Sequence, residues 1–301
     1  MNPPAVHAVQ DAGVRQRTIA KARILLDALP YMREHWGKTV VVKLGGAAMT
    51  DPRLAESFAE DIALLRFVGI RPVVVHGGGP QISAVSRRLG LEPRFEDGLR
   101  VTDAETLEVA RMVLVGTINK DIVASINRQG IPAAGLSGDD GNLLVAGPRN
   151  GGELGFVGEI TEVRTAILET LMGEFVPIVA SIATDGRGQT YNVNADEAAG
   201  AVAAALGAEK LVYLTDVPGL HEEEGGAQGV LSEVSLEECD ELLVSGAVTG
   251  GMIPKVRSIV HAMRSGASRA HILDGRVPHA LILELFTPEG VGTMVTREVE
   301  P

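Results

Sequence analysis

The sequence predicts an α/β fold built on a parallel sheet. Residues 40–42 and 73–75 are runs of three valines, which are typical of strands buried on both faces. Each run is followed by glycines and then by a helix signal, so the two segments read as successive strand–helix units. The chain has 301 residues with 45% hydrophobic and 22% charged side chains, which is enough for one large domain or two lobes.

Charge and cysteine content limit the classes of function. The formal net charge is −12, which argues against a nucleic-acid-binding surface. Cys239 is the only cysteine, which excludes an intrachain disulfide and fits a reducing cytoplasm. Its acidic neighbours raise the pKa of a thiol, so we expect it to be unreactive. No segment resembles a membrane span or a secretory signal, so we expect a cytoplasmic protein that binds neither nucleic acid nor membrane.

The N-terminal segment predicts a helix ahead of the first core strand. We expect residues 1–13 to be unstructured and residues 14–29 to form an amphipathic helix. Pro30 is expected to kink or end this helix, and residues 31–36 to form a second short one. The apolar stripe then needs a partner, either its own lobe or another subunit.

The first core strand carries a lysine near its carboxyl end. Lys43 is followed by Gly45 and Gly46, and Asp51 with Pro52 then marks a helix start. Ligands of open α/β sheets bind outside the carboxyl ends of the strands, so we expect Lys43 to place a cation in that crevice. The alternative is a lysine that extends into solvent.

The second strand ends in His76 and three glycines, residues 77–79, before a helix that runs through Leu89. Glycines free the backbone to approach a ligand, and the helix N-terminus adds partial positive charge. We therefore expect this loop to bind a phosphate or a carboxylate. A plain tight turn is the alternative.

Arg100 precedes a helix that we expect to begin with a capping box of Thr102 and Glu105 and to run to about Arg128. A guanidinium matches a carboxylate ligand bidentately. Pairing with an acidic neighbour at position 96 or 97 is the alternative. The next expected elements are strands at 131–136, 143–146 and 156–163, an exposed hairpin at 151–155 that acts as a lid, a helix over 162–173 and a buried strand at 176–182.

Asn192, Asn194 and Asp196 occupy alternate positions after a turn at 185–186. Their side chains share one face if the segment is extended, and they look too polar for a core. The alternative is that Asn194 or Asp196 caps the alanine-rich helix that follows to Leu206.

The last hundred residues repeat the theme of a strand followed by a polar loop. A strand at 211–214 leads into Thr215 and Asp216, and Ser235 with Glu238 forms a capping box for a helix to residue 244. Lys255 follows two glycines at a further helix start. The remaining expected elements are a solvated acidic loop at 222–229, a strand at 270–273, a helix at 279–286 and a final strand after a turn at 290–293.

In this order the motifs resemble those of the amino acid kinase family, over residues 38–300. The matching motifs are K-L-G-G at 43–46, H-G-G-G at 76–79, G-L-R-V at 98–101, N-V-N-A-D at 192–196, L-T-D-V at 214–217 and G-G-M-I-P-K at 250–255. The resemblance implies a three-layer αβα sandwich with a mainly parallel central sheet, preceded by an N-terminal helix. It further implies an extension at 1–37, an acyl-substrate lobe at 38–205 and an ATP lobe at 206–301.

The chain is most similar to members that transfer phosphate from ATP to the γ-carboxylate of N-acetyl-L-glutamate, the second step of arginine biosynthesis. The resemblance implies that Asp196 orients two catalytic lysines and that Mg²⁺ arrives with ATP, without a metal site on the protein. The implied catalytic residues are Lys43, Lys255, Asp196 and Gly46. Those implied for the acyl substrate are Gly78, Gly79, Arg100, Asn192 and Asn194. Those implied for ATP are Gly45, Thr215, Asp216, Gly219 and Lys255.

The L-P-Y sequence at 29–31 is similar to the extension of arginine-inhibited members, whose N-terminal helices interlace dimers into a hexamer, a trimer of dimers. This resemblance implies feedback inhibition by L-arginine at a site made by Tyr31, Lys210, His271, Glu284 and Gly290. A histidine such as His271, taken alone, is more often structural. The alternatives to the main reading are another small family member, such as a carbamate kinase, and a non-catalytic arginine-sensing homologue.

Overall fold

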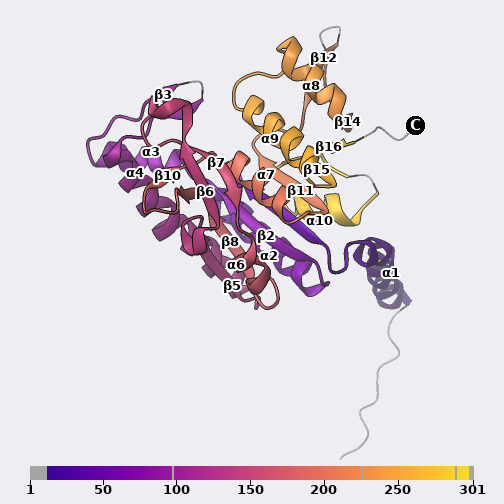
Figure 1. Cartoon of the computed structure of the whole chain (residues 1–301). Helices are drawn as coiled ribbons and strands as arrows, with labels where there is room; N and C mark the ends of the chain where they lie inside the picture. The colour runs from indigo at the N-terminus through magenta and orange to yellow at the C-terminus, as the bar shows by residue number, and fades with distance from the viewer. Residues whose placement is uncertain (1–11, 97, 225–226, 289, 298–301) are drawn as a thin grey trace, which may run out of the picture.

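Strand β1 lies at the middle of an eight-stranded sheet in the computed structural model, which describes residues 12–96, 98–224, 227–288 and 290–297 (Figure 1). β1 pairs in parallel with β2 on one side and with β11 on the other. Among the described strands of this sheet, only β15 and β16 pair antiparallel. In spatial order the strands are β14 (Glu233–Ser235), β16 (Thr293–Thr296), β15 (Arg269–Asp274), β11 (Lys210–Thr215), β1 (Thr39–Leu44), β2 (Arg71–His76), β8 (Val176–Ala180) and β5 (Ala133–Ser137). The expected parallel α/β fold is confirmed.

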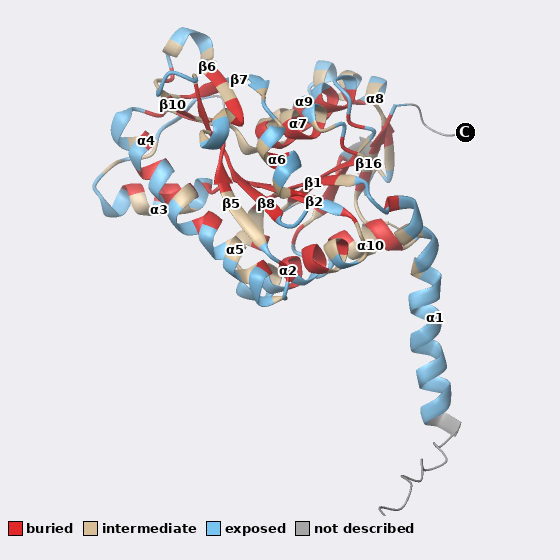
Figure 2. Cartoon of the chain, turned by 60° about the horizontal axis from the view of Figure 1, so that its bottom comes forward, coloured by how far each residue is buried: buried red, intermediate tan, exposed pale blue. Residues whose placement is uncertain are grey.

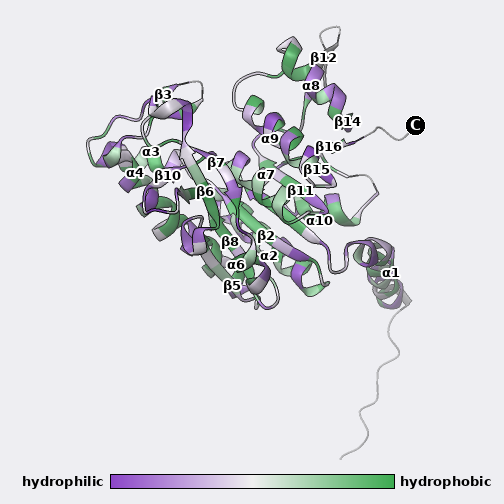
Figure 3. Cartoon of the chain, in the orientation of Figure 1, coloured by the Kyte–Doolittle hydropathy of each residue, from purple (hydrophilic) through white to green (hydrophobic). Residues whose placement is uncertain are grey.

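The valine runs are buried because helices cover both faces of the sheet. Val41, Val73 and Val75 belong to the hydrophobic cluster on one face. Val40 and Val42 belong to the cluster on the other. This alternation follows from the two-residue period of a strand, and burial of every position explains why the run is uniformly apolar. Figure 3 shows the central strands mostly in the hydrophobic colour.

Two helical layers complete the αβα sandwich (Figure 2). One layer contains α2 (Pro52–Phe67), α5 (Asn119–Arg128) and α10 (Ala280–Phe286). The other contains α6 (Ala166–Leu171), α7 (Ala195–Ala205), α8 (Leu236–Ser245) and α9 (Met252–Arg264). A smaller cluster joins α3 (Gly79–Arg88), α4 (Ala104–Arg111) and the π-helical segment η2 (Met112–Ile118).

A four-stranded second sheet lies beside the carboxyl ends of β2 and β8. Its order is β10 (Thr190–Asn192), β9 (Ile182–Thr184), β6 (Leu144–Pro148) and β7 (Gly158–Val163). β6 and β7 form the expected hairpin, with a 3₁₀ turn at Arg149–Gly152. The strand expected over 176–182 divides between the two sheets, and the helix expected from 162 begins only at Ala166, because β7 continues to Val163.

Two short hairpins project from the body. β3 (Phe95–Glu96) pairs with β4 (Leu99–Arg100), and β12 (His221–Glu224) pairs with β13 (Ala227–Val230). The solvated loop expected over 222–229 is therefore wrong, since most of it is paired strand; residues 225–226 lie outside the described part of the chain.

Helix α1 (Ala12–His35) runs through Pro30 without ending, so the expected break and second helix are wrong. Proline removes one hydrogen bond to the carbonyl four residues earlier, here that of Leu26, which is exposed and open to water. Most apolar side chains of α1 are exposed, and the helix extends away from the body (Figure 2). Residues 1–13 were expected to be unstructured, but Ala12 and Gly13 are helical. Residues 1–11 lie outside the described part of the chain.

Two of the three N-cap residues predicted from the local sequence are confirmed at helix starts. The caps Asp51 and Ser235 are confirmed, the latter with the full capping box. The box expected at Thr102 is wrong: Asp103 caps α4, accepting a hydrogen bond from the Thr106 N–H at 2.9 Å. Thr102 is buried, and its hydroxyl instead donates to the Arg100 carbonyl at 2.8 Å.

Cys239 is buried, and burial followed by its acidic neighbours raises the pKa of its thiol to about 12, as expected. None of the helices in the described ranges is long and apolar enough to cross a membrane.

Candidate active site

The predicted catalytic residues come together at the carboxyl ends of β1 and β2. A pocket of about 230 Å³ opens there. Ligands of parallel α/β sheets bind at this edge. The pocket is lined by Lys43 and Asp196 and by all the residues predicted to hold the acyl substrate: Gly78, Gly79, Arg100, Asn192 and Asn194.

Asp196 joins the two predicted catalytic lysines. Lys43 Nζ lies 2.9 Å from Asp196 Oδ1, and Lys255 Nζ lies 2.8 Å from Asp196 Oδ2. Lys43 is on β1, Asp196 is in the first turn of α7, and Lys255 is in the first turn of α9. The side chains that the sequence predicted to converge do so, from positions more than 200 residues apart.

The charges of this triad are strongly coupled. Burial alone would raise the pKa of Asp196, but the adjacent Lys43 and Lys255 ammonium groups bring it to about 2. Burial lowers the pKa of Lys255, while the Asp196 charge opposes that shift. The carboxylate is therefore ionised at neutral pH and fixes two cations side by side.

Two residues missed by sequence reasoning support the triad. Ser258 Oγ donates to the Asp196 carbonyl at 2.6 Å, and Tyr213 OH lies 2.6 Å from Ser258 Oγ. The Lys255 ammonium lies 4.9 Å from the centroid of the Tyr213 ring, within cation–π range. Tyr213 is on β11, directly beside Lys43 of β1 in the register, so the strand pairing is the signal that places it here.

The glycines after Lys43 have no room for a side chain. Gly46 has a φ of +62°, and a Cβ there would collide with the Asp216 carboxylate. A Cβ on Gly45 would collide with the Lys43 ammonium. Asp216 Oδ1 accepts a hydrogen bond from the Ala47 N–H at 2.6 Å. The loop after β11 is thereby tied to the loop after β1.

Thr215 and Gly219, two further residues predicted for ATP, contact other loops rather than the lysine–aspartate triad. Thr215 ends β11 beside Asp274, and its carbonyl accepts from the Gly275 N–H at 2.7 Å. Gly219 lies against Thr293 and Val230. Neither they nor the other three residues predicted for ATP are among the described residues that line the pocket of about 230 Å³.

The Arg100 side chain is anchored by hydrogen bonds, and one of its buried nitrogens has no partner among the described residues. Its Nη2 donates to the Gly79 carbonyl and to Ser83 Oγ, each at 2.7 Å. Its guanidinium carbon lies 4.7 Å from the Phe95 ring centroid. Nη1 is buried and has no hydrogen-bond partner among the described residues. Arg100 bonds to Gly79 and Ser83 and not to Glu96, so the alternative pairing with Glu96 is wrong. Asp97 lies outside the described residues.

Asn194 caps α7, accepting from the backbone N–H groups of Asp196 at 2.8 Å and Glu197 at 3.3 Å. The expectation that 192–196 is extended throughout is therefore wrong, because helix α7 already begins at Ala195. The alternative, that Asn194 caps this helix, is confirmed. Asn192, at the end of β10, donates to Thr102 Oγ1 at 3.3 Å. Both asparagines still line the pocket.

The residues predicted to bind arginine gather at the other end of the sheet. His271 Nδ1 lies 2.7 Å from Glu284 Oε1, and Glu284 Oε2 accepts from the Val291 N–H at 2.8 Å. A Cβ on Gly290, whose φ is +59°, would lie 3.2 Å from Glu284 Oε2. The charge of Lys210 acts on both His271 and Glu284.

His35 joins this cluster and was missed by sequence reasoning. It is buried in the last turn of α1, and its Nδ1 has no hydrogen-bond partner within the described chain. Burial, and next the Lys210 charge, lower its pKa. Tyr31 lies one helical turn before His35, so the two share a helix face.

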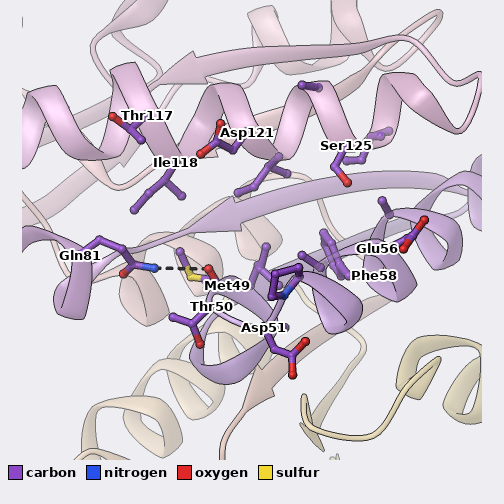
Figure 4. Close-up of a pocket in the computed structure, with 18 of the residues that line it drawn as sticks. Met49, Thr50, Asp51, Glu56, Phe58, Gln81, Thr117, Ile118, Asp121 and Ser125 are labelled. Atoms are coloured by element: carbon purple, nitrogen blue, oxygen red, sulfur yellow. Dashed lines mark hydrogen bonds between the residues drawn. The ribbon is translucent and has the colours of Figure 1, made fainter.

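A second and larger cavity of about 790 Å³ contains none of the predicted site residues (Figure 4). It lies between α2, α3 and the helix formed by η2 and α5. Most of its lining is apolar, with Asp51, Glu56 and Asp121 among the polar residues. The predicted chemistry therefore lies in a smaller cavity than this one.

Comparison with known proteins agrees with this geometry. The family model described as "Amino acid kinase family" matches residues 38–274. The acetylglutamate kinase of Nostoc punctiforme is 51% identical over 94% of this chain and 95% of its own. That of Acidothermus cellulolyticus is 52% identical, over 92% and 96%.

Among solved structures, N-acetylglutamate synthase from Neisseria gonorrhoeae, complexed with coenzyme A and N-acetyl-glutamate, superposes with a TM-score of 0.82 at 29% identity. The match covers 93% of this chain but only 64% of the synthase. The same synthase complexed with coenzyme A and L-arginine gives a TM-score of 0.78 at 26% identity, over 92% of this chain and 65% of the synthase.

Proposed function

The chain belongs to the amino acid kinase family, and we propose that it transfers the γ-phosphoryl group of ATP to the γ-carboxylate of N-acetyl-L-glutamate, in arginine biosynthesis. Relatives that are about half identical over nearly their whole length are acetylglutamate kinases. The observation that carries the proposal is the Lys43–Asp196–Lys255 triad beside a small polar pocket.

The triad suits phosphoryl transfer because that reaction needs positioned charge more than covalent help. Negative charge spreads over the oxygens of the migrating group, and two fixed ammonium groups stabilise it without reorganisation. Asp196 holds both cations while remaining ionised. Gly46 keeps the loop after Lys43 free of side chains, so that backbone N–H groups face the transferred group.

The acyl substrate fits the remaining lining. The free Nη1 of Arg100 suits the α-carboxylate, since its N–H groups can donate charge-assisted hydrogen bonds to a carboxylate oxygen. The N-terminus of α3, with Gly78 and Gly79, favours the negatively charged γ-group. Asp196 is the only acidic residue among those described as lining the pocket, and two lysines neutralise it. Among those residues a free α-ammonium finds no other counter-ion, which favours an acylated amine. Asn192 and Asn194 offer amide groups to the acylated nitrogen.

ATP is proposed to lie over the carboxyl ends of β1 and β11, against Gly45, Thr215, Asp216 and Gly219, with its terminal phosphate beside Lys255. This division assigns residues 38–205 to the acyl substrate and 206–301 to the nucleotide. Mg²⁺ is proposed to arrive with ATP and to neutralise its phosphates.

A coupled assay of ADP release tests the proposal directly. We expect turnover with N-acetyl-L-glutamate, and turnover at least about 100-fold lower with free L-glutamate, because the missing acyl group leaves an unpaired ammonium. Preference for carbamate would instead identify a carbamate kinase. If the protein bound arginine but released ADP with neither N-acetyl-L-glutamate nor carbamate, it would be a non-catalytic arginine sensor.

Replacing Arg100 with alanine is expected to raise the KM for N-acetyl-L-glutamate by about 10- to 100-fold, because a charged hydrogen bond contributes about 1.5–3 kcal/mol. The change in kcat should be smaller, since the group that Arg100 binds does not react. Steady-state kinetics at saturating ATP measures both. Arg88→Ala, at the exposed end of α3, is the control. An unchanged KM in the Arg100 variant would reject this role.

We also propose feedback inhibition by L-arginine in a hexamer. The cluster of Tyr31, Lys210, His271, Glu284 and Gly290 supports the inhibitor site, since a carboxylate such as Glu284 suits a guanidinium. The exposed apolar side chains of α1 support a partner subunit, because an amphipathic helix needs a surface to cover its stripe. A synthase that superposes on this chain was solved in complex with L-arginine, which supports the proposal.

Deleting residues 1–30 is expected to leave a dimer that turns over normally and responds weakly to L-arginine. The deletion removes most of α1 and none of the pocket residues. Light scattering after size-exclusion chromatography reports the assembly, and arginine titrations of ADP release report the inhibition. A hexamer that survives the deletion would contradict the role of α1.

A further inference from the structure

We propose that His76 and Asn119 form a buried clamp that positions the glycine loop at residues 77–79, so that both are positioning residues for the reaction. The inference rests on the proposed function only for the identity of the ligand that the loop binds. Neither side chain lines the pocket.

His76 is held as one neutral tautomer. It is fully buried at the end of β2, with Nδ1 3.0 Å from the Gly77 carbonyl and Nε2 3.2 Å from Asn119 Nδ2. A carbonyl only accepts, so Nδ1 carries the proton, and Nε2 accepts from the Asn119 amide. Burial lowers the pKa of the imidazole to about 4, so it stays neutral at physiological pH. One ring therefore fixes the first peptide of the loop and joins it to a helix.

Asn119 ties that helix to the sheet. It is fully buried at the start of α5, and its Nδ2 lies 2.8 Å from the Ile178 carbonyl on β8 and 3.2 Å from the Leu136 carbonyl on β5. Its backbone N–H donates to the Leu114 carbonyl, five residues earlier. This wide turn closes η2, and π turns of this kind are frequent at functional sites. It brings Asn119 to the same inner face as Leu114.

The helix in turn touches the loop. A Cβ on Gly78 would collide with Ile118 and would lie 2.8 Å from Leu114 Cδ2. On the opposite side, a Cβ on Gly77 would lie 3.0 Å from the Cβ of Ala195, the residue before Asp196. The loop is thus confined between the helix and the start of α7, and any shift of the helix moves the loop relative to the triad.

The cavity of about 790 Å³ borders the same stretch of helix that Asn119 anchors. Ile118 and Asp121 line it, so packing does not hold this stretch of helix from that side (Figure 4). A helix that borders a void lacks the contacts that would otherwise fix its position. The two N–H groups of the Asn119 amide, shared among the carbonyls of two strands and the His76 ring, supply that restraint.

A set of variants at position 76 separates the two hydrogen bonds. His76→Asn keeps a donor near the Gly77 carbonyl, His76→Gln keeps an acceptor near Asn119, and His76→Leu keeps neither. We expect His76→Leu to raise the KM for N-acetyl-L-glutamate and to lower kcat, with kcat/KM falling by about 100-fold, because a misplacement of 1 Å has an effect of that order. The kcat/KM values of His76→Asn and His76→Gln should each lie between those of His76→Leu and the wild type. In all three variants the KM for ATP should change less than twofold.

Gly135→Ala tests the clamp from the other side. A Cβ there would collide with Asn119 Oδ1 without reaching the pocket. We expect the same pattern, a raised acyl KM with an unchanged ATP KM. Leu168→Val, which removes one methylene from the core at α6, is the control for lost stability and should leave both KM values unchanged.

The opposite results overturn the clamp. A lower kcat with both KM values unchanged, in proportion to the folded fraction measured by circular dichroism, would mean a merely structural role. Imidazole nitrogen NMR of the wild type should show His76 protonated at Nδ1 alone from pH 6 to 8, and a titration in that range would contradict the tautomer. Wild-type ADP release and the NMR experiment are independent, so failure of the proposed function and failure of the clamp are distinguishable.

Discussion

Replacing Lys255 with methionine is expected to lower kcat by about 100- to 1,000-fold, and replacing Lys43 in the same way to have a similar effect. Removing one preorganised donor from a developing anion costs about 2.7–4 kcal/mol. Methionine retains the length of the side chain without its charge, so the packing against Tyr213 is largely kept. The KM for N-acetyl-L-glutamate should change much less than kcat, because the cations act on the migrating group.

Lys38→Met is the matched control for the lysine variants. Lys38 stands just before β1, and its side chain is 53% exposed beside Glu209. Stopped-flow or coupled ADP release at saturating substrates gives kcat for all three variants. The double variant at positions 43 and 255 should be little slower than either single variant, since groups that act as a unit are not additive. Near-wild-type turnover in both single variants would remove the basis of the kinase assignment.

The meeting of Lys43 with the glycine loop after β2 was predictable because sheet geometry carries it. Parallel strands bring their carboxyl ends to one edge, so the loops after β1 and β2 had to meet there. The length of the buried runs and the glycines that follow them are local signals. The six ordered motifs added Lys255 and Asp196, which neither hydrophobic periodicity nor spacing alone connects to Lys43.

The errors arise where a distant contact decides between two local choices. Thr102 and Asp103 are both good capping residues, but Thr102 is buried and pairs with Gly155 in an isolated bridge, which leaves Asp103 to cap the helix. Pro30 lies inside α1, and the carbonyl that it leaves without a helical hydrogen bond belongs to the exposed Leu26. The hairpin of β12 and β13 had a usable signal in the dipeptide Gly225-Gly226, which the surrounding acidic residues outweighed in our reading.

The residues that the sequence did not reveal are those that act through other residues. Tyr213, Ser258 and Asn119 look like ordinary strand or helix positions along the chain. Their partners are 17 to 62 residues away, as in the Ser258–Asp196 and Asn119–Ile178 hydrogen bonds. Only the register of the strands and the packing of α7 on α9 bring such side chains together.

Replacing Asp196 with asparagine is expected to lower both turnover and the free energy of unfolding. The amide is neutral, so the Lys43 and Lys255 ammonium groups lose their shared counter-ion in a buried site. Breaking a buried ion pair costs about 3–5 kcal/mol. The lysines then repel each other, and kcat should fall by at least the factor expected for losing one of them. Denaturant titrations and kcat measurements at pH 7 give both quantities.

The pH dependence distinguishes this charge effect from a simple loss of packing. The folded-state pKa of Asp196, about 2, lies below its ordinary value of 3.8. Its contribution to stability is therefore fully present above about pH 4 and is lost as the pH falls towards 2, and it amounts to about 2 kcal/mol. Asp196→Asn should lack this part of the acid-induced loss of stability, whereas Asp27→Asn, on the exposed face of α1, should retain it. If the Asp196 variant lost stability between pH 4 and 2 as steeply as the wild type, the carboxylate would not be the ionised centre of the triad, and the two lysines would need another source of their fixed positions.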